Sequence, residues 1–205
     1  MSRITLTKAS LSKQKGLLKT YGAVLPSLDL KRRQISAERA RARRQLEELE
    51  QRARELEAEV ARLCPMLAHE HIRLDGLARV EQVRVVEENL IGTRLPRVEA
   101  ITVQVADEGP LSRPFWVDHV VDRLRQALEI EIRRQVAQER IELLLLAERT
   151  VTQRFNLFDK VLIPRTRGHI RTIAIYLSDA ERAAVVNSKL AKRKKERAQQ
   201  GALAR

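Results

Sequence analysis

A hydrophobic residue recurs along the first third of the chain at alternating steps of three and four. From Leu11 to Leu67 this rule visits seventeen positions, and fourteen hold an apolar residue or Tyr21 without any slip of register. A mean spacing of about 3.5 residues is typical of a coiled-coil helix, whose slight under-winding keeps one stripe facing a partner. The pattern predicts one long helix over residues 11–67, which Pro26 is expected to kink or split.

A second long helix is predicted to start near Phe115–Val117. Its apolar positions form two stripes, and Leu143–Leu146 adds a run of four leucines. Apolar surface on more than one side indicates that this helix contacts more than its N-terminal partner. Pro164 is expected to interrupt the helix. The stripe of the two helices that faces the partner helix, called the seam below, is predicted to consist of Leu11, Leu18, Leu25, Leu28, Ile35, Leu46, Leu49, Leu56, Val60, Leu63, Val151, Phe155, Phe158, Leu162, Ile170, Ile173 and Leu177.

Two arginines stand at seam positions of the first helix, where apolar residues are expected. Arg32 and Arg39 could fix the register of the two helices, as polar seam residues often do at some cost in stability. Their long side chains could instead extend around the seam to solvent. The sequence leaves both interpretations open.

Seven of the 13 glycines and prolines lie from Pro65 to Pro114, and two short β-branched runs lie between the helices. Alternating apolar residues predict short strands within 80–85 and 101–105. The link Asn89–Pro96 between them is expected to be too long for a tight two-residue turn. Because a lone hairpin is marginally stable in water, it is expected to rest on the helices or on another protein.

These patterns predict a mainly α fold: a long antiparallel two-helix coiled coil formed by the N- and C-terminal helices, with a small central β-hairpin or short-helix region. Only 3% of residues are aromatic, which suits a narrow seam without a thick core. The predicted segments are an N-terminal helix (1–68), an irregular middle with the hairpin (69–116), a C-terminal helix (117–190) and a basic tail expected to fray (191–205).

The net charge of +13 is concentrated at the two ends of the chain. Residues 1–68 carry 15 basic and 8 acidic side chains and residues 189–205 carry 7 and 1, whereas residues 69–116 carry 6 and 8. An antiparallel pair of helices would bring both basic ends together, so an anionic partner is expected there. A basic coiled-coil adaptor that binds nucleic acid is the alternative function. Since no nucleic-acid motif or set of stacking aromatics accompanies the tail, a solvated helical end or one that contacts an acidic protein is favoured.

No residue pattern in the chain predicts catalysis. The phosphate-binding glycine motifs are absent, His69 and His71 lie two residues apart, and Cys64 is the single cysteine. No catalytic residue, cofactor or metal ligand is therefore predicted. The chain also lacks the apolar run of about 18–20 residues that a membrane span needs and has no signal-peptide core, so a cytoplasmic protein without membrane insertion is expected.

Three blocks of the sequence resemble the D subunit of V-type (V/A-type) ATPases and ATP synthases of the bacterial branch. They are Leu6–Glu38 (LTKASLSKQKGLLKTYGAVLPSLDLKRRQISAE), Asn89–Pro96 (NLIGTRLP) and Val151–Asp179 (VTQRFNLFDKVLIPRTRGHIRTIAIYLSD). The resemblance implies a non-catalytic central-stalk rotor subunit that transmits torque between the ATP-handling head and the membrane rotor ring.

The resemblance also implies the partners of such a chain. They would be the A and B subunits of the head, the F subunit, and the C subunit above the rotor ring, in a hetero-oligomer peripheral to the inner membrane, with no direct nucleotide binding. Candidate partner contacts come from the matching blocks and the leucine run: Lys31, Arg32, Arg33, Arg154, Asn156, Lys160, Arg165, Leu143, Leu146, Asn89, Gly92 and Pro96.

Overall fold

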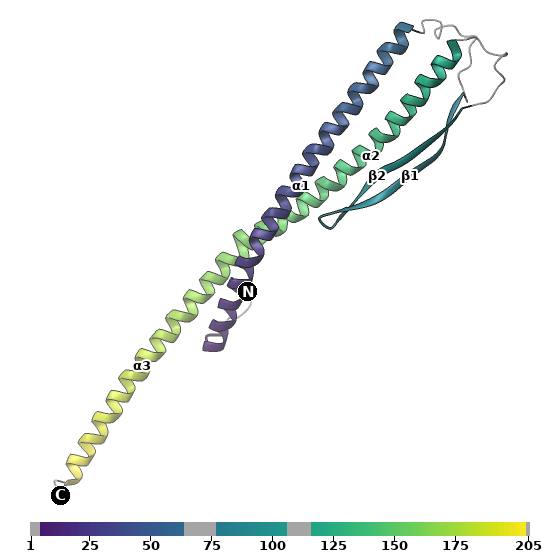
Figure 1. The fold of residues 1–205 in the computed structure, drawn as a ribbon. Coiled ribbons are helices and arrows are strands. Elements are labelled where there is room, and N and C mark those ends of the chain that lie inside the picture. Colours follow the sequence, from purple (N-terminus) through teal and green to yellow (C-terminus); the bar gives the residue numbers. More distant parts are fainter. Residues whose placement is uncertain (1–4, 64–76, 106–115, 204–205) are drawn as a thin grey trace. The chain divides into compact units, whose positions relative to one another are not determined.

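The computed structural model describes residues 5–63, 77–105 and 116–203, and most of these residues are helical (Figure 1). This confirms the predicted fold class of a long N-terminal helix, a long C-terminal helical part and a hairpin between them. The elements in chain order are α1 (Lys8–Leu63), β1 (Ala78–Leu90), β2 (Thr93–Val105), α2 (Trp116–Asn156), the π-helix η2 (Leu157–Leu162) and α3 (Ile163–Leu203).

Contacts divide the chain into two units, and each unit contains part of both helical regions. Unit 1 comprises Met1–Leu30 and Thr152–Arg205, and unit 2 comprises Lys31–Val151. The segment boundaries at 68, 116 and 190 that composition suggests stay a prediction. Fraying of the tail also stays a prediction, and α3 continues to Leu203.

Helix α1 begins at a threonine cap and continues through its proline. The backbone N–H of Ser10 donates to Thr7 Oγ1 at 3.2 Å, which satisfies one of the free donors at the helix start. Of the two expectations for Pro26, a split is wrong, because α1 is continuous across it, whereas a kink stays a prediction. An interior proline costs about 3 kcal/mol. Leu25 and Leu28, which flank it in the sequence, are half-buried, and burial of one side of a helix is what stabilises most protein helices.

The hairpin is longer and its turn tighter than the sequence predicts. Strands β1 and β2 each have 13 residues and pair antiparallel, with register shifts between Val80 and Gln82 and between Arg84 and Val85. The segment expected to be too long for a tight turn is mostly strand, and Ile91 and Gly92 alone form the turn. Both have positive φ, 54° and 77°, as a type I′ hairpin turn requires.

The turn is fixed by a side chain at its start. Asn89 Oδ1 accepts a hydrogen bond of 2.9 Å from the backbone N–H of Gly92. Asparagine side chains commonly bond to the backbone of the same turn in this way, and glycine takes the left-handed conformation without strain. The link therefore needs no further loop residues.

Pro164 does not end the helical region, but the turn before it is wider than an α-helix. The six residues of η2 are π-helical, and the N–H of Ile163 bonds to the carbonyl of Phe158, five residues back. A proline clashes with the carbonyl four residues before it in an α-helix. The wider turn is thus placed where it relieves the clash, and α3 continues from Ile163.

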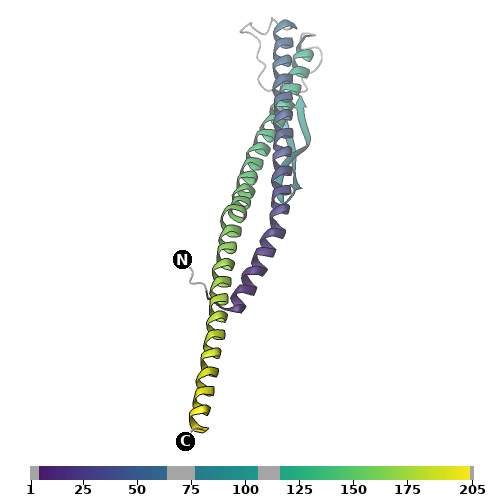
Figure 2. The ribbon, with the colours of Figure 1, turned by 90° about the vertical axis from the view of Figure 1, so that its left-hand side faces the viewer.

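In unit 1, the start of α1 lies antiparallel to η2 and α3 (Figure 2). Lys8 Nζ lies 3.1 Å from Glu181 Oε1, and the ring of Tyr21 meets the edge of Phe158 with 5.4 Å between centroids. Ile163, Thr166 and Ile173 are buried in this unit. Several sequence-based expectations concern residues outside the described part of the chain, namely Cys64, His69, His71 and Phe115. The side chain of the predicted seam residue Leu63 is likewise not described.

Candidate functional site

The tip of the hairpin lies in the main apolar core of unit 2. Leu95 of β2 is fully buried together with Ile35 of α1 and Leu144 of α2, and Ala42 and Val151 complete the cluster. The turn Ile91–Gly92 brings this part of β2 back onto the helix pair. Five half-buried residues line the same core: Leu90, Ile91, Ile141, Leu143 and Ala147. The second apolar face expected on the C-terminal helix is therefore covered in part by the protein's own hairpin.

Beside this core, one arginine connects all four elements of unit 2. The guanidinium of Arg140 on α2 donates from Nη2 to Glu38 Oε1 of α1 at 2.9 Å and from Nη1 to Glu88 Oε2 of β1 at 3.2 Å. Nη1 also lies 3.5 Å from the carbonyl oxygen of Pro96 in β2. The side chain is only 14% exposed, so these charge-assisted bonds are shielded from water.

Two further ion pairs cross between the helices of unit 2. Arg39 Nη1 lies 2.5 Å from Glu148 Oε2, with both side chains mostly buried, and Arg123 Nη2 lies 3.0 Å from Glu59 Oε1. The seam arginine Arg39 thus pairs with a carboxylate of the partner helix instead of extending to solvent. A pair at fixed positions on two helices favours one register over its neighbours.

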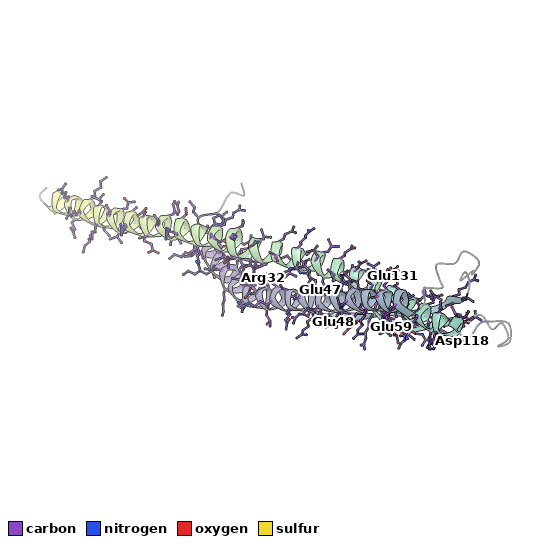
Figure 3. All side chains as sticks on the ribbon, turned by 90° about the horizontal axis from the view of Figure 1, so that it is seen from above. Arg32, Glu47, Glu48, Glu59, Asp118 and Glu131 are labelled. Atoms are coloured by element: carbon purple, nitrogen blue, oxygen red, sulfur yellow. The ribbon has the colours of Figure 1, made fainter. Side chains whose placement is uncertain are left out.

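Among the described residues, the largest resolved shift in pKa is that of Glu131, a half-buried residue of α2 that Figure 3 labels. Arg134 donates two hydrogen bonds to the Glu131 carboxylate, at 2.7 and 2.8 Å, and Gln135 donates a third at 2.9 Å. The bonds from Arg134 are the main cause that lowers the pKa of Glu131 from 4.5 to about 2. The same contact raises the pKa of Arg134.

In unit 1, α3 presents large apolar side chains to solvent beyond its buried positions. Those exposed by half or more are Ile175, Tyr176, Val185, Val186 and Leu190. The basic residues that follow, from Lys189 to Arg197, are exposed as well. Exposed aliphatic side chains next to cationic ones are what a binding surface for an acidic protein offers.

The predicted seam residues lie on the less exposed side of their helices. Ile35, Leu56, Val151 and Ile173 are buried, and the other predicted seam residues with described side chains are half-buried. Whether all of them face a partner helix as a single seam stays a prediction.

The predicted partner contacts are distributed over both units. Asn89 and Gly92 are joined by a hydrogen bond in the hairpin turn. Lys31 lies next to this turn, since a β-carbon added to Gly92 would be 3.5 Å from Lys31 Nζ. Leu143 is half-buried against the core, whereas Leu146 is 57% exposed. The remaining candidates are half-buried (Arg32, Asn156, Pro96) or exposed (Arg33, Arg154, Lys160, Arg165).

Sequence reasoning missed Arg140 and did not single out Leu95. Leu95 stands in the block NLIGTRLP, so the motif was a usable signal for it. No sequence signal pointed to Arg140, because its partners Glu38 and Glu88 are 102 and 52 residues away in the chain. Only the folded arrangement shows that this arginine differs from the others on α2.

Over the part of the chain that the structure describes, no helix combines the length and apolar character that a membrane span requires. Within the same residues, no group of three or more histidine, cysteine, aspartate or glutamate side chains could hold a metal ion.

The chain is thus a mainly helical protein with a long N-terminal helix, a long C-terminal helical part, a β-hairpin between them, and exposed apolar and basic side chains on α3. The family model for the ATP synthase D subunit matches residues 10–193. The V-type ATP synthase D subunit of Borreliella burgdorferi is 33% identical over 194 residues, which cover 94% of this chain and 95% of that protein. The D subunits of Chlamydia muridarum and Chlamydia caviae are 32% and 33% identical, each over 94% of this chain and over 96% and 94% of their own lengths. The chain belongs to the ATP synthase D subunit family.

Proposed function

We propose that this chain is the central-stalk rotor subunit of a V-type ATPase or ATP synthase. It would transmit torque between a head of A and B subunits, which handle ATP, and the ion-translocating ring in the membrane. The observation that carries the proposal is the match to the D subunit family over nearly the whole chain. In this role the protein is a non-catalytic member of a hetero-oligomer on the cytoplasmic side of the membrane, and the F and C subunits are its further partners.

The contacts inside each unit support a torque-bearing role. A single helix twists easily, whereas two helices tied to each other must shear their contacts before they can twist separately. Unit 1 has the Lys8–Glu181 pair and the Tyr21–Phe158 contact, and unit 2 has Arg39–Glu148 and Arg123–Glu59. Each tie joins helical segments that are far apart in the sequence, so each resists sliding of one helix along the other.

The exposed surface of α3 supports contact with a protein head. Val185, Val186 and Leu190 are each more than half exposed, close to the basic residues of the tail. A rotor couples to its head when the head's successive nucleotide states bind its surface with different affinity. At about 100° per residue, Val185, Val186 and Leu190 lie within about 140° of one another around the helix. The apolar side chains are therefore not spread evenly around α3, and this asymmetry is what such discrimination requires.

A truncation tests the proposal in the assembled complex. Removing residues 182–205 keeps Glu181, the partner of Lys8, but deletes the exposed end of α3. The variant complex should hydrolyse ATP while pumping several-fold fewer ions per ATP, because the A and B subunits of the head would bind the rotor subunit less tightly. A full-length control with Val185, Val186 and Leu190 replaced by serine separates loss of apolar contact from loss of length.

Two outcomes contradict the proposal. One is an unchanged number of ions pumped per ATP in an assembled complex that carries the truncated chain. The other is failure of the intact chain to co-purify with A, B and F subunits when all are produced together. Salt-sensitive binding of the isolated chain to DNA or RNA would instead favour the nucleic-acid adaptor, which the family match does not favour.

A further inference from the structure

The hairpin is anchored to the helices of unit 2 at its two ends, and between these anchors the middle of β1 is exposed. Near its base, Leu77 is buried with Val117 and Val121 of α2. At its tip, Leu95 is buried in the main core. Between these anchors β1 is exposed at every position from 81 to 87, although three of those residues are valines.

A groove separates the middle of the hairpin from the helices. It has a volume of about 720 Å³ and is lined by β2 residues around Val98, by α1 residues around Glu48 and by α2 residues around Arg133. Its walls carry both arginines and glutamates. A groove of this size and polarity is filled by water rather than by side chains, so the middle of the hairpin contributes little to docking.

Arg140 stands at the end of this groove, next to the apolar tip. Its bonds to Glu88 and to the Pro96 carbonyl are made to the hairpin, and its bond to Glu38 ties the same guanidinium to α1. The Nε atom of Arg140 is buried and has no acceptor among the described residues. The charge is therefore held by the hairpin and α1 together, and loss of the hairpin's acceptors would leave it with fewer partners in a buried position.

We propose that Arg140 is a latch that docks the hairpin tip on the helix pair, and that the hairpin is an arm with a docked and an undocked state. In the docked state Leu95 fills the socket formed by Ile35, Ala42, Leu144 and Val151. In the undocked state the socket opens to solvent, while the base near Leu77 stays attached. The inference goes beyond the rotor role and does not depend on it.

The pairing of the hairpin allows it to move as a body. Its two strands are paired with each other from Ala78 and Val105 to the turn, so undocking breaks no strand pairing. The two register shifts lie between the base and the tip, and β-bulges are where paired strands bend. Few side chains of β1 outside the tip oppose the motion, because β1 is exposed from 81 to 87, and Val98 and Ile101 of β2 are only half-buried.

Distances between two spin labels on the full-length chain test the latch. One label replaces Arg94 at the hairpin tip, where the side chain is 80% exposed, and the other replaces exposed Glu142 on α2, with Cys64→Ser removing the native cysteine. The labelled parent should give one narrow distance distribution. Arg140→Ala should add a second, longer population, and hydrogen exchange at the tip amides should become faster by about tenfold or more.

Arg134→Ala is the matched control, since Arg134 is also on α2 but pairs with Glu131 of the same helix. It should leave both measurements unchanged. Glu88→Gln is the second test variant, because it weakens only the hairpin's share of the latch and keeps the Arg140–Glu38 pair. It should show the same second population to a smaller extent.

Unchanged distances and exchange in both Arg140→Ala and Glu88→Gln would overturn the proposal. Loss of helical circular dichroism in Arg140→Ala with unchanged distances in Glu88→Gln would overturn it as well, because Arg140 would then hold the helices rather than the hairpin. An equal effect of Arg134→Ala would also overturn it, since the effect would not be specific to the bridging arginine.

Discussion

Three arginines of unit 2 show how burial changes what the same side chain does. Arg134 is bound to Glu131 on the surface of α2, where ion pairs contribute about 0–1 kcal/mol because water screens them. Arg39 and Arg140 are mostly buried and pair with carboxylates on other elements. Removing one partner there leaves a buried charge uncompensated, which costs about 3–5 kcal/mol. The buried pairs therefore specify which elements meet.

The leucine run on α2 offers a matched pair of substitutions. Leu144 is fully buried and Leu146, two residues away, is 57% exposed. We expect Leu144→Ala to lower the free energy of unfolding by about 2–5 kcal/mol, because it leaves a cavity in the core that holds the hairpin tip. Leu146→Ala should change it by about 0.5 kcal/mol or less. Urea unfolding followed by circular dichroism measures both, and equal losses would contradict the assigned burial.

The pKa of Glu131 predicts a small acid-sensitive contribution to stability. A folded-state pKa lowered from 4.5 to about 2 gives stability that is present above pH 4.5 and is lost as the pH falls toward 2. The melting temperature of Glu131→Gln should thus lie below that of the parent at neutral pH and converge with it near the acid end. Arg134→Gln, which removes the same contact from the other side, should show the same window. A difference that stays constant over the whole range would contradict the prediction.

At the scale of elements, η2 absorbs a slip in the hydrophobic pattern. Up to Leu162 the less exposed positions of the C-terminal helix follow steps of three and four, through Phe155 and Phe158. From Val151 to Leu162 these steps alternate strictly between four and three, so the next positions would be 165, 169 and 172. The less exposed positions instead lie one residue later, at Thr166, Ile170 and Ile173. A π-turn accommodates one extra residue. The stripe therefore keeps facing the same side across the slip.

Single-residue deletions test this relation in a Pro164→Ala background, in which an α-helix is free of the proline clash. Deleting exposed Asp159 from η2 should convert the π-turn to α-helix and keep Ile173 buried, with a loss of about 1 kcal/mol or less. Deleting exposed Arg171 should rotate the following residues by about 100° and expose apolar surface. That variant should lose about 2–5 kcal/mol, as for truncation of a buried side chain. Thermal unfolding compares the two, and equal losses would contradict the relation.

The hairpin shows where sequence reasoning about elements was incomplete. The strands were found from their β-branched centres, but the ends near the turn were not, because Arg94 and Pro96 do not continue a simple alternation. Proline is tolerated in β2 since this strand is paired on one side alone within the described sheet. The turn itself depends on the Asn89 side chain and the left-handed backbone at Ile91 and Gly92. Local chemistry, rather than segment length, decided the connection.

For the whole molecule, net charge governs association more than folding. The chain carries +13, and such an excess attracts an anionic partner and speeds the encounter, while salt weakens both effects. The exposed lysines of the tail are the densest part of this charge. In the proposed role, these lysines are expected to attract an acidic surface on the A and B subunits of the head.

Replacing Lys192, Lys194 and Lys195 with glutamine lowers the net charge from +13 to +10. We expect association of the chain with the A and B subunits to slow by about threefold to tenfold at low salt and by less at high salt. Stopped-flow or surface plasmon resonance at two ionic strengths measures this. A control with Arg43, Arg62 and Arg79, which are exposed and outside the tail, replaced by glutamine should slow association less. Equal slowing in both triple variants would contradict a specific role of the tail.

The amino-acid sequence was enough to predict the two long helices, the hairpin between them and the less exposed side of each helix. These features depend on period and on turn residues, which are local properties of the chain. The folded arrangement was needed to show that Leu95 enters the core of unit 2, that Arg140 bridges four elements and that Arg39 pairs with Glu148. Each of these contacts joins residues about 50 to more than 100 positions apart, and one periodic pattern is compatible with many such pairings until packing selects one.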